Sequence, residues 1–244
     1  MSSTVIIIPS RLSAKRFPDK PLKVIGSKEI IMHVYNLAVK SGAGEVLVAT
    51  PDKSISELIV KNGGKSFISK QSHETGTDRV FEAFKIFYSS KPKIIINLQG
   101  DMPNLKPDSI SYLSQYLNKG LCDVATLASS LKNNTETHDK NIVKVVTKND
   151  IKKSQFSEAL DFKRELNETK NKFIYHHIGI YGFTSKALMR YVNLKRSKLE
   201  LERNLEQMRV LENDMRIHVG YINSNPLSID TEKDFLEVKR IMEL

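Results

Sequence analysis

The chain has little of what would define several other classes of protein. Cys122 is its one cysteine, which excludes an internal disulfide and a cysteine-based zinc cluster. No segment approaches the roughly 20 consecutive apolar residues that a membrane-spanning helix needs. The apolar run at Ile6–Ile8 is too short for a secretory signal, and no small-residue cleavage site follows it. We therefore expect a protein of a reducing, bacterial-type cytoplasm with no membrane partner.

Two common nucleotide-binding patterns are also missing. The chain has no GxxxxGK[ST] sequence, which argues against a Walker-type NTPase, and no GxGxxG sequence, which argues against a dinucleotide oxidoreductase. The formal net charge is +10, and a basic chain can bind nucleic acid. Here the lysines are spread along the chain, and aromatic residues do not alternate with them as in a single-strand-binding surface. We expect no nucleic-acid partner.

The first half of the chain alternates between short apolar runs and amphipathic helical patterns. Such alternation predicts a mostly parallel sheet with right-handed crossovers and flanking helices, an α/β architecture of the Rossmann-like kind. The predicted strands cover 5–8, 45–49, 65–68 (an edge strand) and 94–98, and the predicted helices lie at 30–38, around 55–59 and around 80–84.

After about residue 120, strand-like and helical patterns no longer alternate regularly. Strands are predicted at 124–127, 143–147, 178–183 and 217–222, whereas 148–172 is polar and only weakly periodic. A long helical pattern follows Ser197, with Leu201, Leu205, Met208 and Leu211 along one side. Asp230 is predicted to be the N-cap of the last helix. No repeat or linker is visible, so we expect one domain over residues 1–244 with an inserted subregion at roughly 130–215.

A cationic loop directly follows the first apolar run. It carries Arg11, Lys15, Arg16 and Lys20, and it is stiffened by Pro18 and Pro21. Ligands of open α/β sheets bind at the carboxyl ends of the strands, so this loop lies where a triphosphate would bind. One guanidinium group can donate two parallel hydrogen bonds to phosphate oxygens, and a lysine supplies a positive charge on a flexible side chain. The plainer alternative is a solvated basic loop beside a strand.

The sequence NLQGD ends at Asp101, directly after a predicted buried strand. A carboxylate at that position, after a glycine that permits close approach, suits a magnesium ion that bridges phosphates. A Gly-Asp pair is also a common turn. Asp230 ends a segment that could return to the same crevice, although helix capping alone would explain it. The sequence HETGTDR at 73–79 could present hydroxyls and N–H groups to a nucleotide, or simply cap a helix through Thr75 or Thr77.

Seven segments, taken in order, resemble one family. They are IIIPSRLSAKRFPDKPL, HETGTDR, NLQGD, NIVKVV, HHIGIYGF, LEQMRVL and SIDTEKDF, and they run from Ile6 to Phe235. This set resembles the CMP-Kdo synthetases, the 3-deoxy-manno-octulosonate cytidylyltransferases. The resemblance implies a nucleotide-diphospho-sugar transferase fold, a homodimer and the use of Mg²⁺. It also implies the joining of CTP to the sugar acid Kdo with release of pyrophosphate, as in lipopolysaccharide biosynthesis.

The resemblance also assigns roles to individual residues. The implied catalytic residues are Arg11, Lys20 and Asp101, and the implied metal ligands are Asp101 and Asp230. The implied nucleotide-binding residues are Pro9, Ser10, Arg11, Arg16, Lys20, Thr75, Gly76, Thr77, Arg79 and Gln99. The implied sugar-binding residues are Gln99, His177, Tyr181, Glu206 and Gln207, to which the departure at Glu158 adds a further candidate. Without the resemblance, His177 and Tyr181 would be read as core residues and Glu206–Gln207 as an exposed helix face.

The chain departs from the family pattern at three positions. Met102 replaces the glutamate of QGDEP, Glu158 replaces the arginine of FSRAxIP, and Arg203 replaces an acid of the SxLExxExLEQLR helix. A carboxylate favours an amino group where an arginine favours hydroxyls or another carboxylate. We therefore hypothesise a modified substrate such as 8-amino-8-deoxy-Kdo. Neutral drift at a face turned to solvent or to a dimer partner is the alternative.

Three other kinds of function are alternatives. The first is a cytidylyltransferase for another sugar acid, such as a nonulosonic acid, although the other signatures of that family are missing. The second is a non-catalytic nucleotide binder, which would not need both metal-binding acids. Nucleic-acid binding ranks third and predicts a steep salt dependence without any need for CTP.

Overall fold

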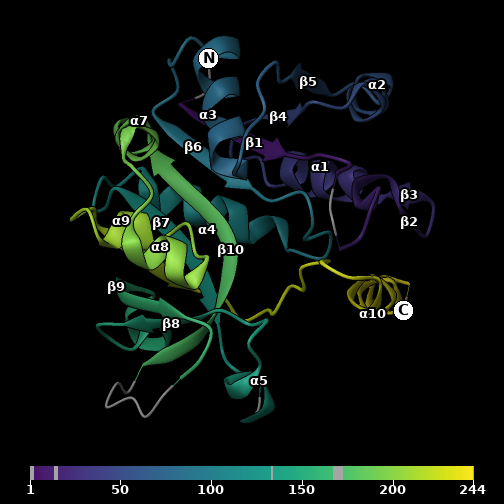
Figure 1. Cartoon of the computed structure of the whole chain (residues 1–244). Coiled ribbons are helices and arrows are strands. Elements are labelled where there is room, and N and C mark those ends of the chain that lie inside the picture. Colours follow the sequence, from purple (N-terminus) through teal and green to yellow (C-terminus); the bar gives the residue numbers. More distant parts are fainter. Residues whose placement is uncertain (1–2, 14–15, 133, 167–172, 244) are drawn as a thin grey trace. The chain divides into compact units, whose positions relative to one another are not determined.

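A computed structural model describes residues 3–13, 16–132, 134–166 and 173–243 (Figure 1). Lys15 of the cationic loop therefore lies outside the described residues. The chain divides into two compact units, one of Met1–Ser114 with Pro226–Leu244 and the other of Gln115–Asn225. The predicted subregion at 130–215 falls inside the second unit, and the single domain over 1–244 stays a prediction. Among the described residues, no helix is both long and apolar enough to cross a membrane.

The first unit is built around four parallel strands in the order β5-β4-β1-β6. They are β1 (Thr4–Pro9), β4 (Glu45–Thr50), β5 (Lys65–Ile68) and β6 (Ile94–Leu98). Residues of β1 and β6 are buried without alternation, as expected for parallel strands covered on both faces. The carboxyl ends of these strands meet at one edge, where the loops after β1 and β6 begin.

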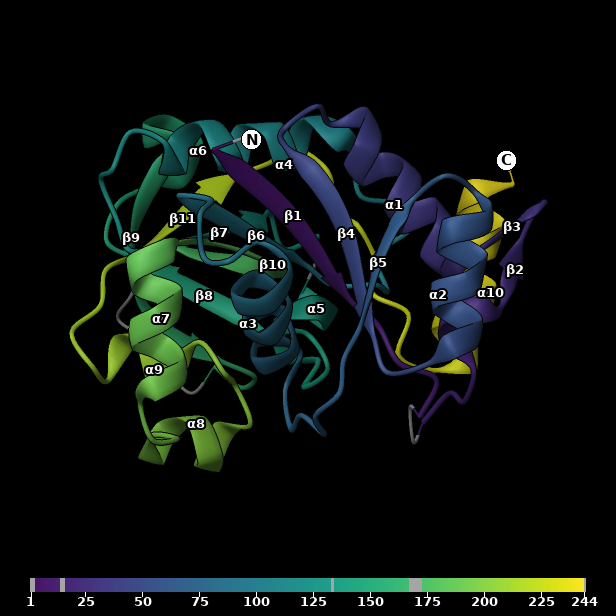
Figure 2. The same ribbon diagram turned by 90° about the horizontal axis from the view of Figure 1, so that it is seen from above.

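Helices cover both faces of these strands. The helices are α1 (Ile30–Lys40), α2 (Lys53–Lys61) and α3 (Gly76–Phe87), and Figure 2 shows α1 and α3 on opposite sides of β1 and β4. Helix α4 (Pro107–Leu117) runs across the boundary of the units and was not predicted. A one-turn helix η1 (Lys20–Leu22) and a hairpin of β2 (Val24–Ile25) and β3 (Lys28–Glu29) precede α1.

The C-terminal segment returns to the first unit. Helix α10 (Glu232–Met242) places Val238 in a small core with Phe17, Ile25, Ile30 and Ile229. This core joins the cationic loop, the hairpin and the segment before α10. Residues about 210 positions apart along the chain are therefore held together by apolar packing.

The second unit is a mixed sheet in the order β10-β7-β11-β9-β8, and β10 also pairs with β8. The strands are β7 (Val124–Ser129), β8 (Lys144–Thr147), β9 (Phe156–Lys163), β10 (Ile174–Thr184) and β11 (Ile217–Tyr221). The short helices are α5 (Asn134–His138), α6 (Ile151–Ser154), α7 (Ser185–Asn193), α8 (Lys198–Arg203) and α9 (Met208–Leu211). Among the described strands of this unit, β7 and β11 run parallel and the other pairs are antiparallel.

The predicted α/β class is confirmed, with every predicted strand in place and β5 at an edge. The prediction of one long helix after Ser197 is wrong. Asn204 adopts a left-handed conformation (φ 53°) and ends α8, and a non-helical segment separates α8 from α9. The polar stretch 148–172, in which we predicted no element, contains α6 and β9.

Candidate active site

The loop after β1 is anchored where the strand ends. Ser10 N donates to Ala49 O (3.0 Å), and Leu12 N donates to the Asp52 carboxylate (2.8 Å). Asp19 closes the loop by donating its N–H to Leu12 O (3.2 Å), with a left-handed φ of 55°. These bonds hold the loop at the carboxyl edge of the first unit, while the side chain of Arg11 stays exposed.

Helix α3 brings a buried cation to the same edge. The Arg79 side chain is only 5% exposed, and its Nε is buried with no hydrogen-bond partner among the described residues. Burial lowers the pKa of Arg79, and the nearby charge of Arg11 lowers it further. Ser10 Oγ is likewise buried and unpartnered in the described part of the chain. The Arg79 guanidinium, with the charge of Arg11 near it, and the unsatisfied polar atoms at this edge are suited to an anion.

Lys20 links the two predicted metal-binding acids. Its Nζ donates to Asp101 Oδ2 (2.9 Å) and to Ile229 O (2.6 Å), and it lies 3.8 Å from Asp230 Oδ1. Arg16 Nη2 reaches the same Asp230 oxygen at 3.1 Å. The structure therefore brings together four residues that the sequence analysis selected from positions 16 to 230.

Asp230 is not the N-cap of α10, which corrects the sequence prediction. Thr231 is the N-cap, and it forms a capping box with Asp234, whose carboxylate also accepts from the N–H of Asp230. The side chain of Asp230 is consequently free of the capping role and points toward Lys20 and Arg16. Because Thr231 caps the helix, the Asp230 carboxylate is left to contact Lys20 and Arg16.

Asp101 and Asp230 fit a magnesium ion by their donor chemistry. Both carboxylates reach the same ammonium group, and Mg²⁺ in phosphate-transfer sites is held by one or two carboxylates together with substrate phosphates. Within the described ranges, no three or more acidic, histidine or cysteine side chains gather closely enough to hold a metal without a substrate. A metal bound here would therefore depend on the nucleotide for further ligands.

The start of α3 packs closely against the ends of β1 and β6. A Cβ on Gly76 would lie 3.3 Å from Gln99 Oε1 and 3.4 Å from Pro9 Cγ, so a glycine permits this approach. Gln99 is oriented by a hydrogen bond to Asn97 (2.7 Å), which in turn donates to Thr77 (3.2 Å). Capping by Thr75, one of the two predicted caps, is confirmed: its hydroxyl accepts from Asp78 N.

The predicted sugar-binding residues, apart from Gln99, lie in the second unit. His177 is 7% exposed, and burial together with neighbouring His176 lowers its pKa to about 3, so it is neutral at pH 7. Tyr181 follows on the same strand, with its ring centroid 5.5 Å from that of His177. Burial, and then the charge of Glu206, raise the pKa of Tyr181 well above its usual value. Both groups are therefore neutral at pH 7.

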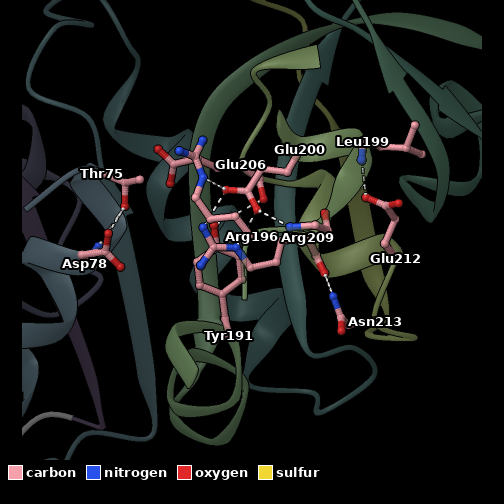
Figure 3. A network of polar contacts seen from close by, with 11 residues as sticks. Thr75, Asp78, Tyr191, Arg196, Leu199, Glu200, Glu206, Arg209, Glu212 and Asn213 are labelled. Carbon is pink, nitrogen blue, oxygen red and sulfur yellow. Dashed lines mark hydrogen bonds and ion pairs between the residues drawn. The ribbon is translucent and has the colours of Figure 1, made fainter. Parts of the chain in front are cut away.

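Glu206 and Gln207 lie in the segment between α8 and α9, which an ion-pair network fixes (Figure 3). Glu200 is fully buried, and its carboxylate accepts from Arg209 Nε (2.7 Å), Arg209 Nη2 (2.6 Å) and Arg196 Nε (3.1 Å). Leu205 N donates to Glu200 O (3.2 Å). The sequence analysis missed this network, although Glu200 at the third position after Ser197 is a capping-box signal.

The three departures from the family pattern have structural partners. Met102 is 3% exposed and packs in the first unit. Arg203 forms an ion pair with Asp161 and donates to Phe162 O (2.8 Å). Glu158 pairs with Lys148 Nζ at 3.4 Å, with its side chain 44% exposed. An amino group on a substrate would have to compete with Lys148 for Glu158, so the modified-sugar hypothesis gains no support from this geometry.

The first unit also carries an open pocket of about 420 Å³ that none of the site residues described above lines. It is lined by the β2–β3 hairpin, α1 and the end of α10, including His33, Lys40 and Glu243. None of the predicted site residues contributes to it. The site is therefore defined by its polar clusters and not by this pocket.

Comparison with known proteins identifies the family of the chain. Residues 5–217 match the family model of the cytidylyltransferases. The 3-deoxy-manno-octulosonate cytidylyltransferase of Bartonella tribocorum is 35% identical over 243 residues, covering 98% of both chains. That of Nitrobacter hamburgensis is 37% identical over 240 residues, covering 98% of this chain and 92% of its own.

Solved structures give the same result. The CMP:2-keto-3-deoxy-manno-octonic acid synthetase complexed with CTP superposes with a TM-score of 0.89 at 33% identity, over 99% of both chains. A cytidylyltransferase from Leptospira borgpetersenii shares the fold, with a TM-score of 0.64 at 18% identity, over 100% of this chain and 87% of its own. The chain belongs to the cytidylyltransferases, and among them to the 3-deoxy-manno-octulosonate cytidylyltransferase (CMP-Kdo synthetase) family.

Proposed function

We propose that the protein transfers CMP from CTP to the anomeric hydroxyl of 3-deoxy-D-manno-octulosonate and releases pyrophosphate. The assignment of CTP rests on the buried, unpartnered Arg79 Nε, which lies near the charge of Arg11 at the carboxyl edge of the first unit. Ser10 Oγ, at the end of β1, is a second buried atom without a partner among the described residues. Charge and unsatisfied donors at that edge fit a triphosphate. The sugar half rests on the full-length relatives, whose names specify this sugar acid.

The reaction is an in-line displacement at the α-phosphorus. A bond forms between the anomeric oxygen of the sugar acid and the α-phosphorus, the bond to the bridging oxygen breaks, and pyrophosphate leaves with the electron pair. The anomeric hydroxyl loses its proton to solvent water. Such reactions depend on positioning and on stabilisation of negative charge more than on covalent chemistry by the protein.

We assign the charge stabilisation to the loop after β1. Arg11, Arg16 and Arg79 would hold the phosphates, while Lys20 would move from its carboxylate partners toward the α-phosphate and the departing pyrophosphate. Asp101 and Asp230 would hold Mg²⁺, which when bound neutralises phosphate charge and lowers the pKa of the attacking hydroxyl. Pro9, Thr75, Gly76, Thr77 and Gln99 would complete the nucleotide side.

We assign recognition of the sugar acid to His177, Tyr181, Glu206 and Gln207, together with Gln99. His177 and Tyr181 are neutral and can exchange hydrogen bonds with hydroxyl groups. Mg²⁺ dependence and a homodimer are further parts of the proposal and come from the family resemblance. The cytoplasmic location is also part of the proposal and rests on composition, above all on the single cysteine.

The first experiment is pyrophosphate release by the purified protein with CTP and Mg²⁺. Kdo, 8-amino-8-deoxy-Kdo and a nonulosonic acid are supplied in separate reactions at equal concentration. We expect turnover with Kdo, abolished by chelation of the metal and absent when CTP is omitted. Turnover of a nonulosonic acid alone contradicts the sugar assignment, and preference for the amino sugar restores the hypothesis about Glu158. CTP binding without turnover of any sugar contradicts the catalytic assignment.

A further inference from the structure

Thr126, on β7, makes an unusual set of contacts with β10. The side chain is fully buried, and its hydroxyl oxygen lies 2.7 Å from Ile180 O, 3.2 Å from Ile178 O and 2.9 Å from His177 Nε2. All of these groups belong to the second unit. One hydroxyl therefore touches two carbonyl oxygens and the imidazole that we assign to the sugar acid.

An irregularity in the β7–β10 pairing creates this arrangement. His177 pairs with Ala128 and Ile178 with Leu127, but the register then shifts, so that Thr126 pairs with Tyr181. Gly179 and Ile180 are skipped. Bulges of this kind leave backbone groups out of the ladder and re-aim nearby side chains, often beside active sites. The Thr126 hydroxyl fills the gap and gives the Ile180 carbonyl a donor.

The contacts decide where the hydrogens lie. Carbonyl oxygens only accept hydrogen bonds, and a hydroxyl has one hydrogen to donate. If Thr126 donated to His177, its oxygen would face the Ile180 carbonyl oxygen at 2.7 Å with no hydrogen between them. The hydroxyl must therefore donate to Ile180 O and accept from His177 Nε2, which places the ring hydrogen on Nε2.

We infer that Thr126 is a positioning residue that holds His177 as its Nε2–H tautomer, so that Nδ1 accepts a hydrogen bond from a hydroxyl of the sugar acid. The assignment of that hydroxyl rests on the proposed function; the tautomer does not. Phe162 and Tyr181 flank the ring, with centroids 5.1 and 5.5 Å away. The low pKa of His177 keeps the ring neutral, as an acceptor nitrogen requires.

The tautomer is measured directly by nitrogen-15 NMR of the histidine side chains at pH 7. The His177→Asn variant, which lacks one set of ring signals, identifies the signals of His177. We expect a protonated Nε2 and an unprotonated Nδ1 in the wild-type protein. A protonated Nδ1 or a charged ring overturns the inference, whichever substrate the enzyme uses.

Two substitutions then test the role of the hydroxyl. Thr126→Val keeps the shape and removes the hydroxyl, and Thr126→Ser keeps the hydroxyl. For Thr126→Val we expect loss of the single tautomer and a rise of about tenfold in KM for Kdo, with KM for CTP unchanged, because one directed hydrogen bond is lost. Thr126→Ser should restore the tautomer and most of the affinity for Kdo.

Thr147→Val is the matched control. Thr147 is equally buried in the second unit and donates to Asn149 O at 2.7 Å, but it does not contact His177. We expect a similar loss of stability with no change in tautomer or in KM for Kdo. Equal kinetic defects in Thr126→Val and Thr147→Val, or an unchanged tautomer in Thr126→Val, would mean that Thr126 only supports the fold. If the wild-type protein does not turn over Kdo at all, the proposed function fails, while the NMR result still decides the tautomer.

Discussion

Replacing Glu200 by alanine tests how the second unit holds the segment that carries Glu206 and Gln207. The Glu200 carboxylate is fully buried and accepts two hydrogen bonds from Arg209, one from Arg196 and one from Ser197 N (3.1 Å). The substitution removes the carboxylate from an Arg209 side chain that is only 4% exposed.

The expected loss of stability is large. Removing one partner of a buried ion pair costs about 3–5 kcal/mol, because the remaining charge is left in a poorly solvated place. Arg209 keeps its stacking on the Tyr191 ring, 4.3 Å from the centroid, so we expect the lower end of that range. For a chain of this length, about 3 kcal/mol corresponds to a fall of roughly 6–12 °C in Tm.

The loss should depend on pH in a defined direction. Burial alone would raise the pKa of Glu200, but the hydrogen bonds from Arg209, Ser197 and Arg196 together lower it below the ordinary 4.5. A lowered folded-state pKa adds stability that is fully present above the unfolded-state pKa and is lost as pH falls through the folded-state pKa. The difference between wild type and Glu200→Ala should therefore be full at pH 7 and shrink below about pH 4.5.

Urea unfolding at pH 7 and at pH 4 measures both effects, with Glu202→Ala as the control. Glu202 is on the same helix but half exposed, and it pairs only loosely with Lys198 (3.7 Å). We also expect Glu200→Ala to raise KM for the sugar acid and to leave KM for CTP unchanged. Equal stability of the two variants at pH 7 would refute the reasoning, and so would a difference between wild type and Glu200→Ala that is as large at pH 4 as at pH 7.

Four further predictions concern the site itself. Lys20→Gln should lower kcat by about 10²–10³ through loss of charge stabilisation, whereas Lys53→Gln, on the exposed face of α2, should leave it unchanged in the pyrophosphate assay. Arg79→Met should raise KM for CTP by about tenfold or more without affecting KM for Kdo, measured by varying each substrate in turn. Gly76→Ala should weaken CTP binding in calorimetry, because the added methyl crowds Gln99 and Pro9; unaltered affinity would contradict the close packing seen there. The unfolding free energy of the wild type should fall as pH is lowered from 6.5 to 5, because in this range His177 is protonated only in the unfolded chain, and His177→Asn should reduce that fall. If the unfolding free energies of both proteins depend on pH in the same way, the low folded-state pKa of His177 is contradicted.

Periodicity along the chain was enough to predict the four parallel strands of the first unit, every strand of the second unit except β9, and most helices of the first unit. Apolar runs such as Ile94–Leu98 and helical spacing such as that of α1 are local signals, and burial in a parallel sheet strengthens them. The long helix after Ser197 was mispredicted for a physical reason. Its apolar spacing is helical, but the chain breaks at Asn204 and places Glu200 against Arg209, a contact that periodicity does not encode.

The clustering of the first-unit site followed partly from sequence. Arg11, Lys20 and Asp101 each follow a predicted strand, so topology alone puts them at one edge. For the segment before α10, the sequence indicated only that the chain could return to the same crevice. The structure supplies the contact: Phe17 and Ile229 share a core, and Lys20 Nζ binds Ile229 O.

The sequence by itself determined the fold class, the cationic loop, the acids at 101 and 230, and, through its motifs, the family. These are properties of residue type and local order. Tertiary structure alone decided which partner each polar group has: Lys20 between two carboxylates, Arg79 buried beside Arg11, Glu200 on Arg209, and Thr126 on His177. A hydrogen bond depends on distance and direction to within a fraction of an ångström, and only the packed chain sets those between residues far apart in sequence.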